Sequence, residues 1–99
     1  MQASVAIQVL PGVTDDAEVI RIVDAVIAYI KSTGLHYYVG PFETTIEGDD
    51  YDQLMDIVKA CQHIAIDAGC PSVAAYIKVS YKPEGGVLTI DEKVSKHHS

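Results

Sequence analysis

Two stretches of the chain repeat their apolar residues at the three- and four-residue spacing of an amphipathic helix, and each ends at a glycine. The pattern predicts a first helix over 15–33, closed by Gly34, and a second over 50–68, closed by Gly69. Both expected helix starts have the residue spacing of a capping box. Pro71 forbids continuation of the second helix. The apolar stripes consist of Val19, Ile20, Val23, Val26, Ile27 and Ile30 in the first helix and of Leu54, Met55, Ile57, Val58, Cys61, Ile64, Ala65 and Ala68 in the second.

Four stretches rich in β-branched and aromatic residues flank these helices and predict strands. The resulting order of strand, helix, strand, strand, helix, strand is typical of the ferredoxin-like fold, an α+β arrangement. We therefore expect a four-stranded antiparallel sheet of order 4-1-3-2 with both helices on one face. A single domain would span 1–99, with 83–99 as a short extension in which 87–96 forms a short strand and then a helical turn near Asp91. The expected strands cover 3–10, 36–40, 43–48 and 73–82.

The charge and the cysteines of the chain exclude several classes of function. A formal net charge of −7 argues against nucleic-acid binding, which needs a basic face. No apolar run reaches the roughly 20 residues that span a bilayer, and no basic signal-peptide region begins the chain, so we expect a cytoplasmic protein without a membrane partner. Cys61 and Cys70 lack the spacing of a zinc site, and His97 and His98 form a terminal tail. We therefore expect neither a metal nor a cofactor.

Helices on one face of the predicted sheet leave its opposite face, the open face, to meet water or another molecule. Alternation along the strands places Thr44 and Ile46 toward the helices. The open face therefore combines aromatic, polar and charged groups, which is typical of association or ligand binding. We expect a homo-oligomer, and a monomer with a solvated face is the alternative. The open-face residues are Gln8, Thr45, Glu47, Tyr76, Lys78 and one of Tyr37 and Tyr38.

The residues of this face favour binding over catalysis. Glu43 and Glu47 lie four residues apart in a strand, hence about 13 Å, which is too far for a carboxylate pair acting on one bond. The sequence gives no reason to pair His36 with His63. Tyrosine rings and a carboxylate suit a planar, nitrogen-rich, cationic ligand. The alternative for Glu43 and Glu47 is a solvated strand end or a salt bridge to Lys78.

Within this framework, four segments resemble the YkoF-like family of small thiamine-binding proteins, which have the ferredoxin-like fold. The most specific part is the pattern Gly-Leu-x-Tyr-x-Val-x-Pro followed by Thr-x-Ile-Glu-Gly. The resemblance covers nearly the whole chain in order and in length. The matching segments are 6–11, 34–41, 44–48 and 76–79.

The resemblance implies a protein that binds thiamine or its hydroxymethylpyrimidine moiety without transforming it. It also implies a dimer or a dimer of dimers, hence a tetramer, assembled by sheet packing. The ligand-binding positions that it implies are Gln8, Tyr38, Thr45 and Glu47. Two alternatives remain: a structural protein that assembles through its open face without a specific ligand, and a small enzyme of thiamine salvage.

Overall fold

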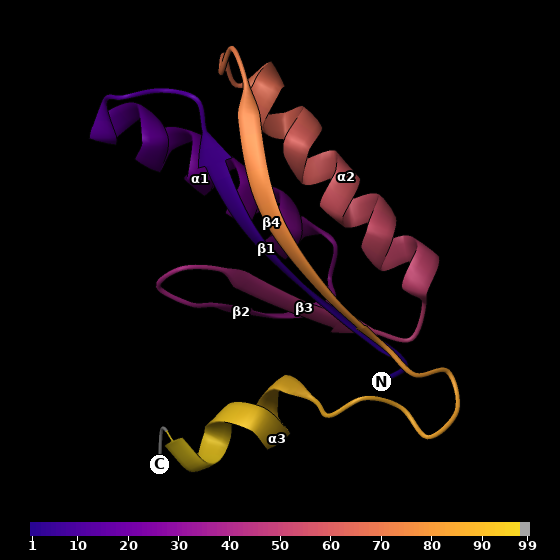
Figure 1. Cartoon of the computed structure of the whole chain (residues 1–99). Helices are drawn as coiled ribbons and strands as arrows, with labels where there is room; N and C mark the ends of the chain where they lie inside the picture. The colour runs from indigo at the N-terminus through magenta and orange to yellow at the C-terminus, as the bar shows by residue number, and fades with distance from the viewer. Residues whose placement is uncertain (98–99) are drawn as a thin grey trace.

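The computed structural model describes residues 1–97, which form one antiparallel sheet with helices on both of its faces (Figure 1). Helices α1 and α2 cover one face, and the short helix α3 lies on the other. Among the described residues, no helix is long and apolar enough to cross a membrane. The elements are β1 (Ala3–Pro11), α1 (Asp16–Ser32), β2 (His36–Val39), β3 (Thr44–Gly48), α2 (Tyr51–Asp67), β4 (Val73–Tyr81), α3 (Ile90–Val94) and the 3-10 helix η1 (Ser95–His97).

The strand order is β2-β3-β1-β4, so the predicted order 4-1-3-2 and the ferredoxin-like topology are confirmed. β1 is central and pairs with β4 over its whole length, from Ala3 opposite Tyr81 to Pro11 opposite Val73. Its pairing with β3 is shorter and stops at Ile7. The end of β1 therefore extends beyond the β2–β3 hairpin.

Helices α1 and α2 begin and end close to the predicted residues because side chains satisfy their free backbone groups. The Asp15 and Asp50 carboxylates accept hydrogen bonds from the Ala17 and Gln53 backbone N–H groups, both at 3.1 Å. Gly34 follows α1 with a φ of 76°, the left-handed conformation expected for a glycine there. The capping box predicted for α1 does not form, because Glu18 binds the Arg21 guanidinium at 2.7 Å instead.

The main core lies between the sheet and the helices α1 and α2. Alternation along the strands was predicted correctly: Val5 and Ile46 face the core and are buried, as is Ile30 from α1. Cys61 is a free, buried thiol, as predicted. Burial raises its pKa to about 11, because a thiolate is poorly solvated there.

The C-terminal segment, residues 83–97, turns back beneath the sheet and covers part of the open face (Figure 1). The predicted helical turn is present as α3, but residues 87–89 form no strand. Ile90 is 3% exposed, and it anchors the segment. His98 of the predicted histidine tail lies outside the described residues. The open face is thus covered in part by its own chain.

Candidate functional site

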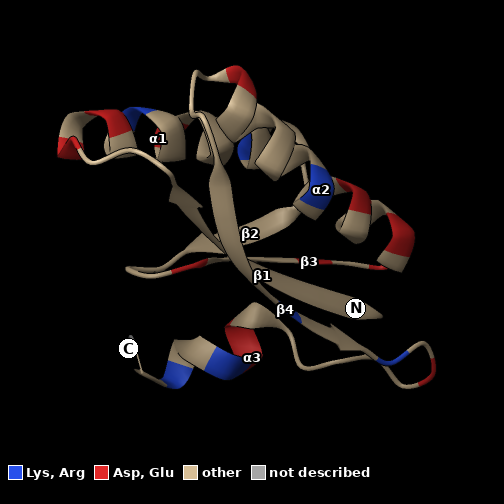
Figure 2. Ribbon diagram, turned by 45° about the horizontal axis from the view of Figure 1, so that its top comes forward, with Lys and Arg blue, Asp and Glu red and all other residues tan. Residues whose placement is uncertain are grey.

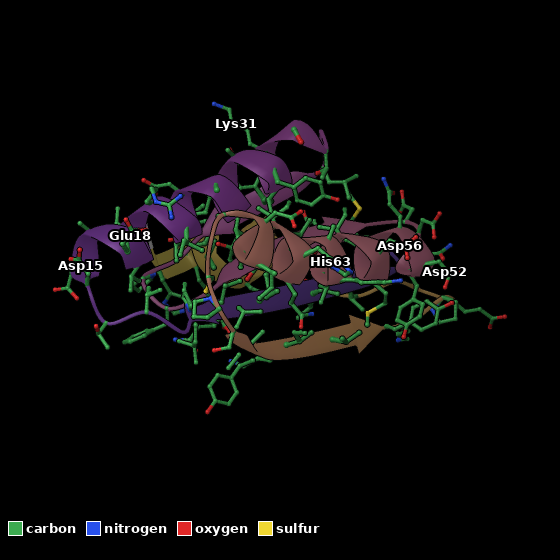
Figure 3. All side chains as sticks on the ribbon, turned by 90° about the horizontal axis from the view of Figure 1, so that it is seen from above. Asp15, Glu18, Lys31, Asp52, Asp56 and His63 are labelled. Carbon is green, nitrogen blue, oxygen red and sulfur yellow. The ribbon has the colours of Figure 1, made fainter. Side chains whose placement is uncertain are left out.

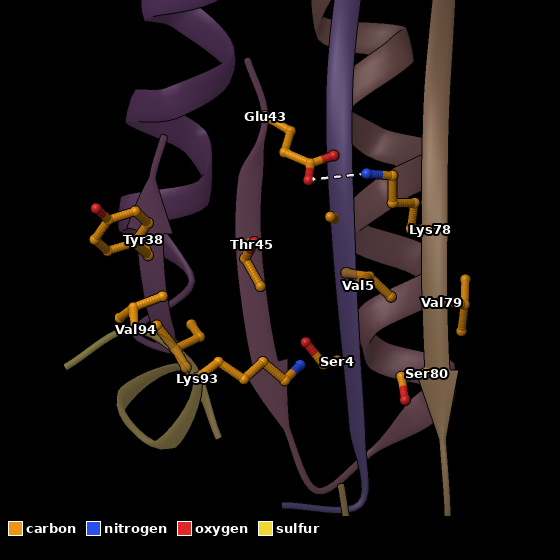
Figure 4. A pocket seen from close by; sticks show the side chains of 12 residues that line it. Ser4, Val5, Tyr38, Glu43, Thr45, Lys78, Val79, Ser80, Lys93 and Val94 are labelled. Atoms are coloured by element: carbon orange, nitrogen blue, oxygen red, sulfur yellow. Dashed lines mark hydrogen bonds and ion pairs between the residues drawn. The ribbon is translucent and has the colours of Figure 1, made fainter. Parts of the chain in front are cut away.

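A pocket of about 280 Å³ lies between the open face and α3 (Figure 4). Strands β1, β3 and β4 provide its floor, β2 contributes Tyr38, and α3 forms one wall. Its volume is near the lower end of the range for small-molecule sites, about 300–1,000 Å³. Among the residues that line it are Ser4, Tyr38, Glu43, Thr45, Lys78, Ser80, Ile90, Lys93 and Val94.

Two of the four predicted site residues, Tyr38 and Thr45, meet in this pocket. They are directly opposite each other in the β2–β3 ladder, so their side chains share a face of the sheet. Tyr37 pairs with Ile46 and packs against the core on the other face. The register thus places Tyr38, and not Tyr37, on the face of the sheet that forms the pocket.

Glu47 is on the predicted face, but its carboxylate is 4% exposed and is absent from the lining of the pocket. Its Oε2 accepts a hydrogen bond of 2.7 Å from the Ile90 backbone N–H at the start of α3. Its Oε1 lies 4.0 Å from Nε2 of His36, its cross-strand neighbour. In this arrangement the carboxylate holds the C-terminal segment. Its contact with a ligand stays a prediction.

Of the two carboxylates considered for a salt bridge to Lys78, Glu43 is the one that makes it. The Lys78 ammonium donates to Glu43 Oε1 at 3.1 Å, across the central strand and at the mouth of the pocket (Figure 4). Only β1 separates the two residues, and both side chains are long enough to meet over small Ala6, the cross-strand neighbour of Lys78. The pair brings one positive and one negative charge to the site.

Gln8 lies apart from the other predicted site residues. It pairs with Tyr76 in the β1–β4 ladder, on the part of the open face that the C-terminal segment leaves uncovered. It lines a second hollow, of about 230 Å³, beside the turn that contains Pro41 and Phe42. The structure therefore does not place Gln8 in the pocket under α3, and its role in ligand binding stays a prediction.

Residues that could form a metal site are not grouped in the part of the chain that the structure describes. The internal histidines are separated by the sheet, since His36 is on the open face and His63 is exposed on α2 (Figure 3). The acidic side chains labelled in Figure 3, such as Asp52 and Asp56, extend from the helical side of the molecule. They are therefore remote from the pocket.

The sequence interpretation missed the contribution of α3 to the site. Residues 89–92 contain a signal that could have found it, because Thr89 and Glu92 have the spacing of a capping box. In the structure both hydrogen bonds of this box are present, and those from Thr89 lower the pKa of the Glu92 carboxyl. The start of a helix at Ile90 could thus be predicted from the sequence. The docking of that helix on the open face could not be predicted.

The fold and the site define a ferredoxin-like α+β domain with a small-molecule-sized pocket on the sheet face opposite its two long helices. Residues 5–98 match the family described as "Thiamine-binding protein". The chain belongs to this family, which confirms the resemblance inferred from the sequence.

Relatives of known sequence or structure have nearly the same length. A UPF0045 protein of Clostridium perfringens is 48% identical over 94 residues, which are 95% of each chain. A solved DUF77 domain from Bacillus cereus has 42% identity and a TM-score of 0.85, covering 98% of this chain and 90% of its own. A Thermotoga maritima structure, described with a proposed role in thiamine biosynthesis or salvage, has 35% identity and a TM-score of 0.84, covering 98% and 99%.

Proposed function

We propose that this protein binds thiamine or its hydroxymethylpyrimidine moiety, without transforming it, in the pocket between the open face and α3. The observation that supports this most directly is the pairing of Tyr38 and Thr45 within a pocket of about 280 Å³ in a member of the thiamine-binding family. The tyrosine ring offers a stacking surface to a pyrimidine. The threonine hydroxyl donates or accepts a hydrogen bond at the ring edge.

The charges of the pocket favour recognition of the pyrimidine part. Glu43 and Lys78 are paired, and Lys93 adds a further positive charge to the lining. A bare thiazolium cation gains little in such surroundings, whereas a neutral aminopyrimidine uses the hydroxyls and the aromatic ring. Glu47 would contribute through its hold on Ile90 at 2.7 Å, which places α3 over the ligand.

We also propose a homo-oligomer, either a dimer or a dimer of dimers. The uncovered part of the sheet supports this, because β4 is an edge strand and its Tyr76, which is 65% exposed, lies on the open face opposite Gln8. The same surface is the feature that favours the second candidate function, a structural protein that assembles without a specific ligand.

A cytoplasmic location, the absence of catalysis, and one domain over 1–99 with 83–99 as its extension stay predictions.

Isothermal calorimetry with thiamine and with hydroxymethylpyrimidine tests the proposal. Tyr38→Leu should weaken binding about tenfold, because a stacked base contributes on the order of 1–3 kcal/mol. Tyr76→Leu is the matched control, since this tyrosine lies on the same sheet face but does not line the pocket. It should leave the affinity unchanged.

Two results would contradict the proposal. Absence of heat at millimolar concentrations of both compounds, with folded protein confirmed by circular dichroism, excludes the ligand class. An equal loss for the two tyrosine variants excludes this pocket. Light scattering on the same samples reports the oligomeric state, and a monomer would contradict the assembly.

A further inference from the structure

Positive charge in this acidic chain is concentrated on one side of the sheet. Four of the 7 basic residues belong to β4 and the segment after it, although the net charge of the chain is −7. Figure 2 shows lysines on α3, beneath the sheet and opposite α1 and α2. Three acidic residues, Glu84, Asp91 and Glu92, accompany these four basic residues, so this part of the chain carries one net positive unit (4 − 3). These four residues are Lys78, Lys82, Lys93 and Lys96.

Within the pocket, the positive charge of Lys93 is uncompensated. Its other two charged side chains, Glu43 and Lys78, neutralise each other at 3.1 Å. Among the described residues, the ion pairs within 4.0 Å do not include Lys93. Glu47 does not line the pocket, and its carboxylate accepts the hydrogen bond from the Ile90 N–H. The pocket therefore carries a net charge of one positive unit.

The position of Lys93 is determined by the anchoring of α3. Ile90 is buried against the sheet, and Lys93 and Val94, three and four residues further along, lie on the same side of the helix. Both line the pocket with Ile90. In Figure 4 the Lys93 side chain runs along the pocket toward Ser4. The ammonium is thus directed over the floor of the pocket rather than away from the domain.

Three hydroxyl side chains line the same pocket as Lys93. Ser4, Thr45 and Ser80 come from three adjacent strands and line the same pocket, and Ser4 is 5% exposed. A hydroxyl donates one hydrogen bond, so a lysine ammonium with several hydroxyls can satisfy the oxygens of a tetrahedral anion. A partly enclosed setting strengthens such contacts relative to water.

We propose that Lys93 recognises an anionic group on the ligand, of the phosphate-monoester class, with Ser4, Thr45 and Ser80 as hydrogen-bond donors. This proposal rests on the proposed function and deepens it, because the ring of the same ligand would lie against Tyr38. A phosphate monoester carries close to two negative charges at pH 7, of which the Lys93 ammonium would offset one. Free inorganic phosphate has the same chemistry, so it must be distinguished from the esterified ligand.

Calorimetry on the full chain compares hydroxymethylpyrimidine, its phosphate monoester and inorganic phosphate. The monoester should bind about tenfold more tightly than the free alcohol, as expected for one charge-assisted contact. Lys93→Gln should reduce this advantage to less than about threefold. Lys96→Gln is the matched control, because it removes the same charge from the same segment but not from the pocket. It should retain the full advantage.

The possible outcomes separate this inference from the proposed function. Equal affinities for the alcohol and the monoester, or an advantage that survives Lys93→Gln, overturn the role of Lys93 while leaving pyrimidine binding intact. Equal affinities for the monoester and inorganic phosphate mean that the pyrimidine contributes nothing, and they overturn both. Binding of neither pyrimidine compound also overturns both.

Discussion

Removal of the Glu47 carboxylate should detach α3 from the sheet. This buried side chain, 4% exposed, accepts the Ile90 N–H at 2.7 Å, and the hydrogen bond joins two segments 43 positions apart in the chain. Ile90 itself is 3% exposed, so its amide has no route to water while α3 is docked. In Glu47→Ala this amide loses its acceptor and is left unsatisfied in the docked state. The docked state should therefore become much less populated.

The expected magnitude follows from the kind of hydrogen bond. A hydrogen bond to a charged group contributes about 1.5–3 kcal/mol, and a buried amide without a partner costs a similar amount. We therefore expect Glu47→Ala to destabilise the docking of α3 by about 2–3 kcal/mol, which is about 30- to 150-fold in the opening equilibrium. Glu47→Gln keeps a neutral acceptor and should cost about 1 kcal/mol. The melting temperature of the whole domain should change less, because the substitution also removes the free-energy cost of burying the Glu47 charge.

Residue-resolved amide hydrogen exchange measures this opening directly. The Ile90 amide should exchange about 30- to 150-fold faster in Glu47→Ala, while amides in β1 keep their protection. Glu43→Ala is the control, since it removes a nearby carboxylate that pairs with Lys78 and not with α3. Unchanged exchange at Ile90 would refute the anchoring role. It would also leave Glu47 free to contact a ligand, as the family resemblance implies.

Two further predictions concern the cap of α3 and the buried thiol. Thr89→Ala should weaken the start of α3 by about 1 kcal/mol, seen as roughly fivefold faster exchange of the Glu92 amide, and Thr89→Ser should not. The Thr89 hydrogen bonds lower the pKa of the Glu92 carboxyl, so the stability that this carboxylate gives to α3 is complete above the ordinary carboxyl pKa and is lost as the pH falls through the lowered value. Amide exchange in α3 that does not change on acidification would contradict this. The pKa of Cys61 is raised from 9.0 to about 11, so the unfolded chain ionises first and the free energy of unfolding should fall by about 1 kcal/mol between pH 8 and pH 10. Urea denaturation should show this fall in the native chain and a smaller one in Cys61→Ala.

The elements of the main fold were predictable because their signals are local. The apolar stripe that contains Ile30 indicated the face of α1 that packs on the sheet, and Gly34 indicated where the helix ends. Strand alternation placed Thr45 and Ile46 on opposite faces of the sheet, as the register confirms. Alternation alone could not choose between Tyr37 and Tyr38, since the choice needs the pairing partner. The register provides it by placing Tyr38 opposite Thr45.

The partners of the charged residues were less predictable than their positions. Both Glu43 and Glu47 were expected near the open face, and Lys78 was expected there too. The sequence does not say which carboxylate the ammonium reaches, because two side chains of similar length compete for it. The structure pairs Lys78 with Glu43 and leaves Glu47 to the Ile90 amide. The missing information was the position of the C-terminal segment.

The sequence by itself determined the ferredoxin-like order of elements, the two faces of the sheet and the membership of a thiamine-binding family. These properties depend on residue spacing within single elements and on motifs that are continuous along the chain. Tertiary structure alone decided that α3 covers the open face, that Glu47 holds it and that Lys93 enters the pocket. The contact between Glu47 and Ile90 joins residues more than 40 positions apart. A helix as short as Ile90–Val94 is not stable alone, so it forms only where its Ile90 N–H finds an acceptor and its Ile90 side chain is buried.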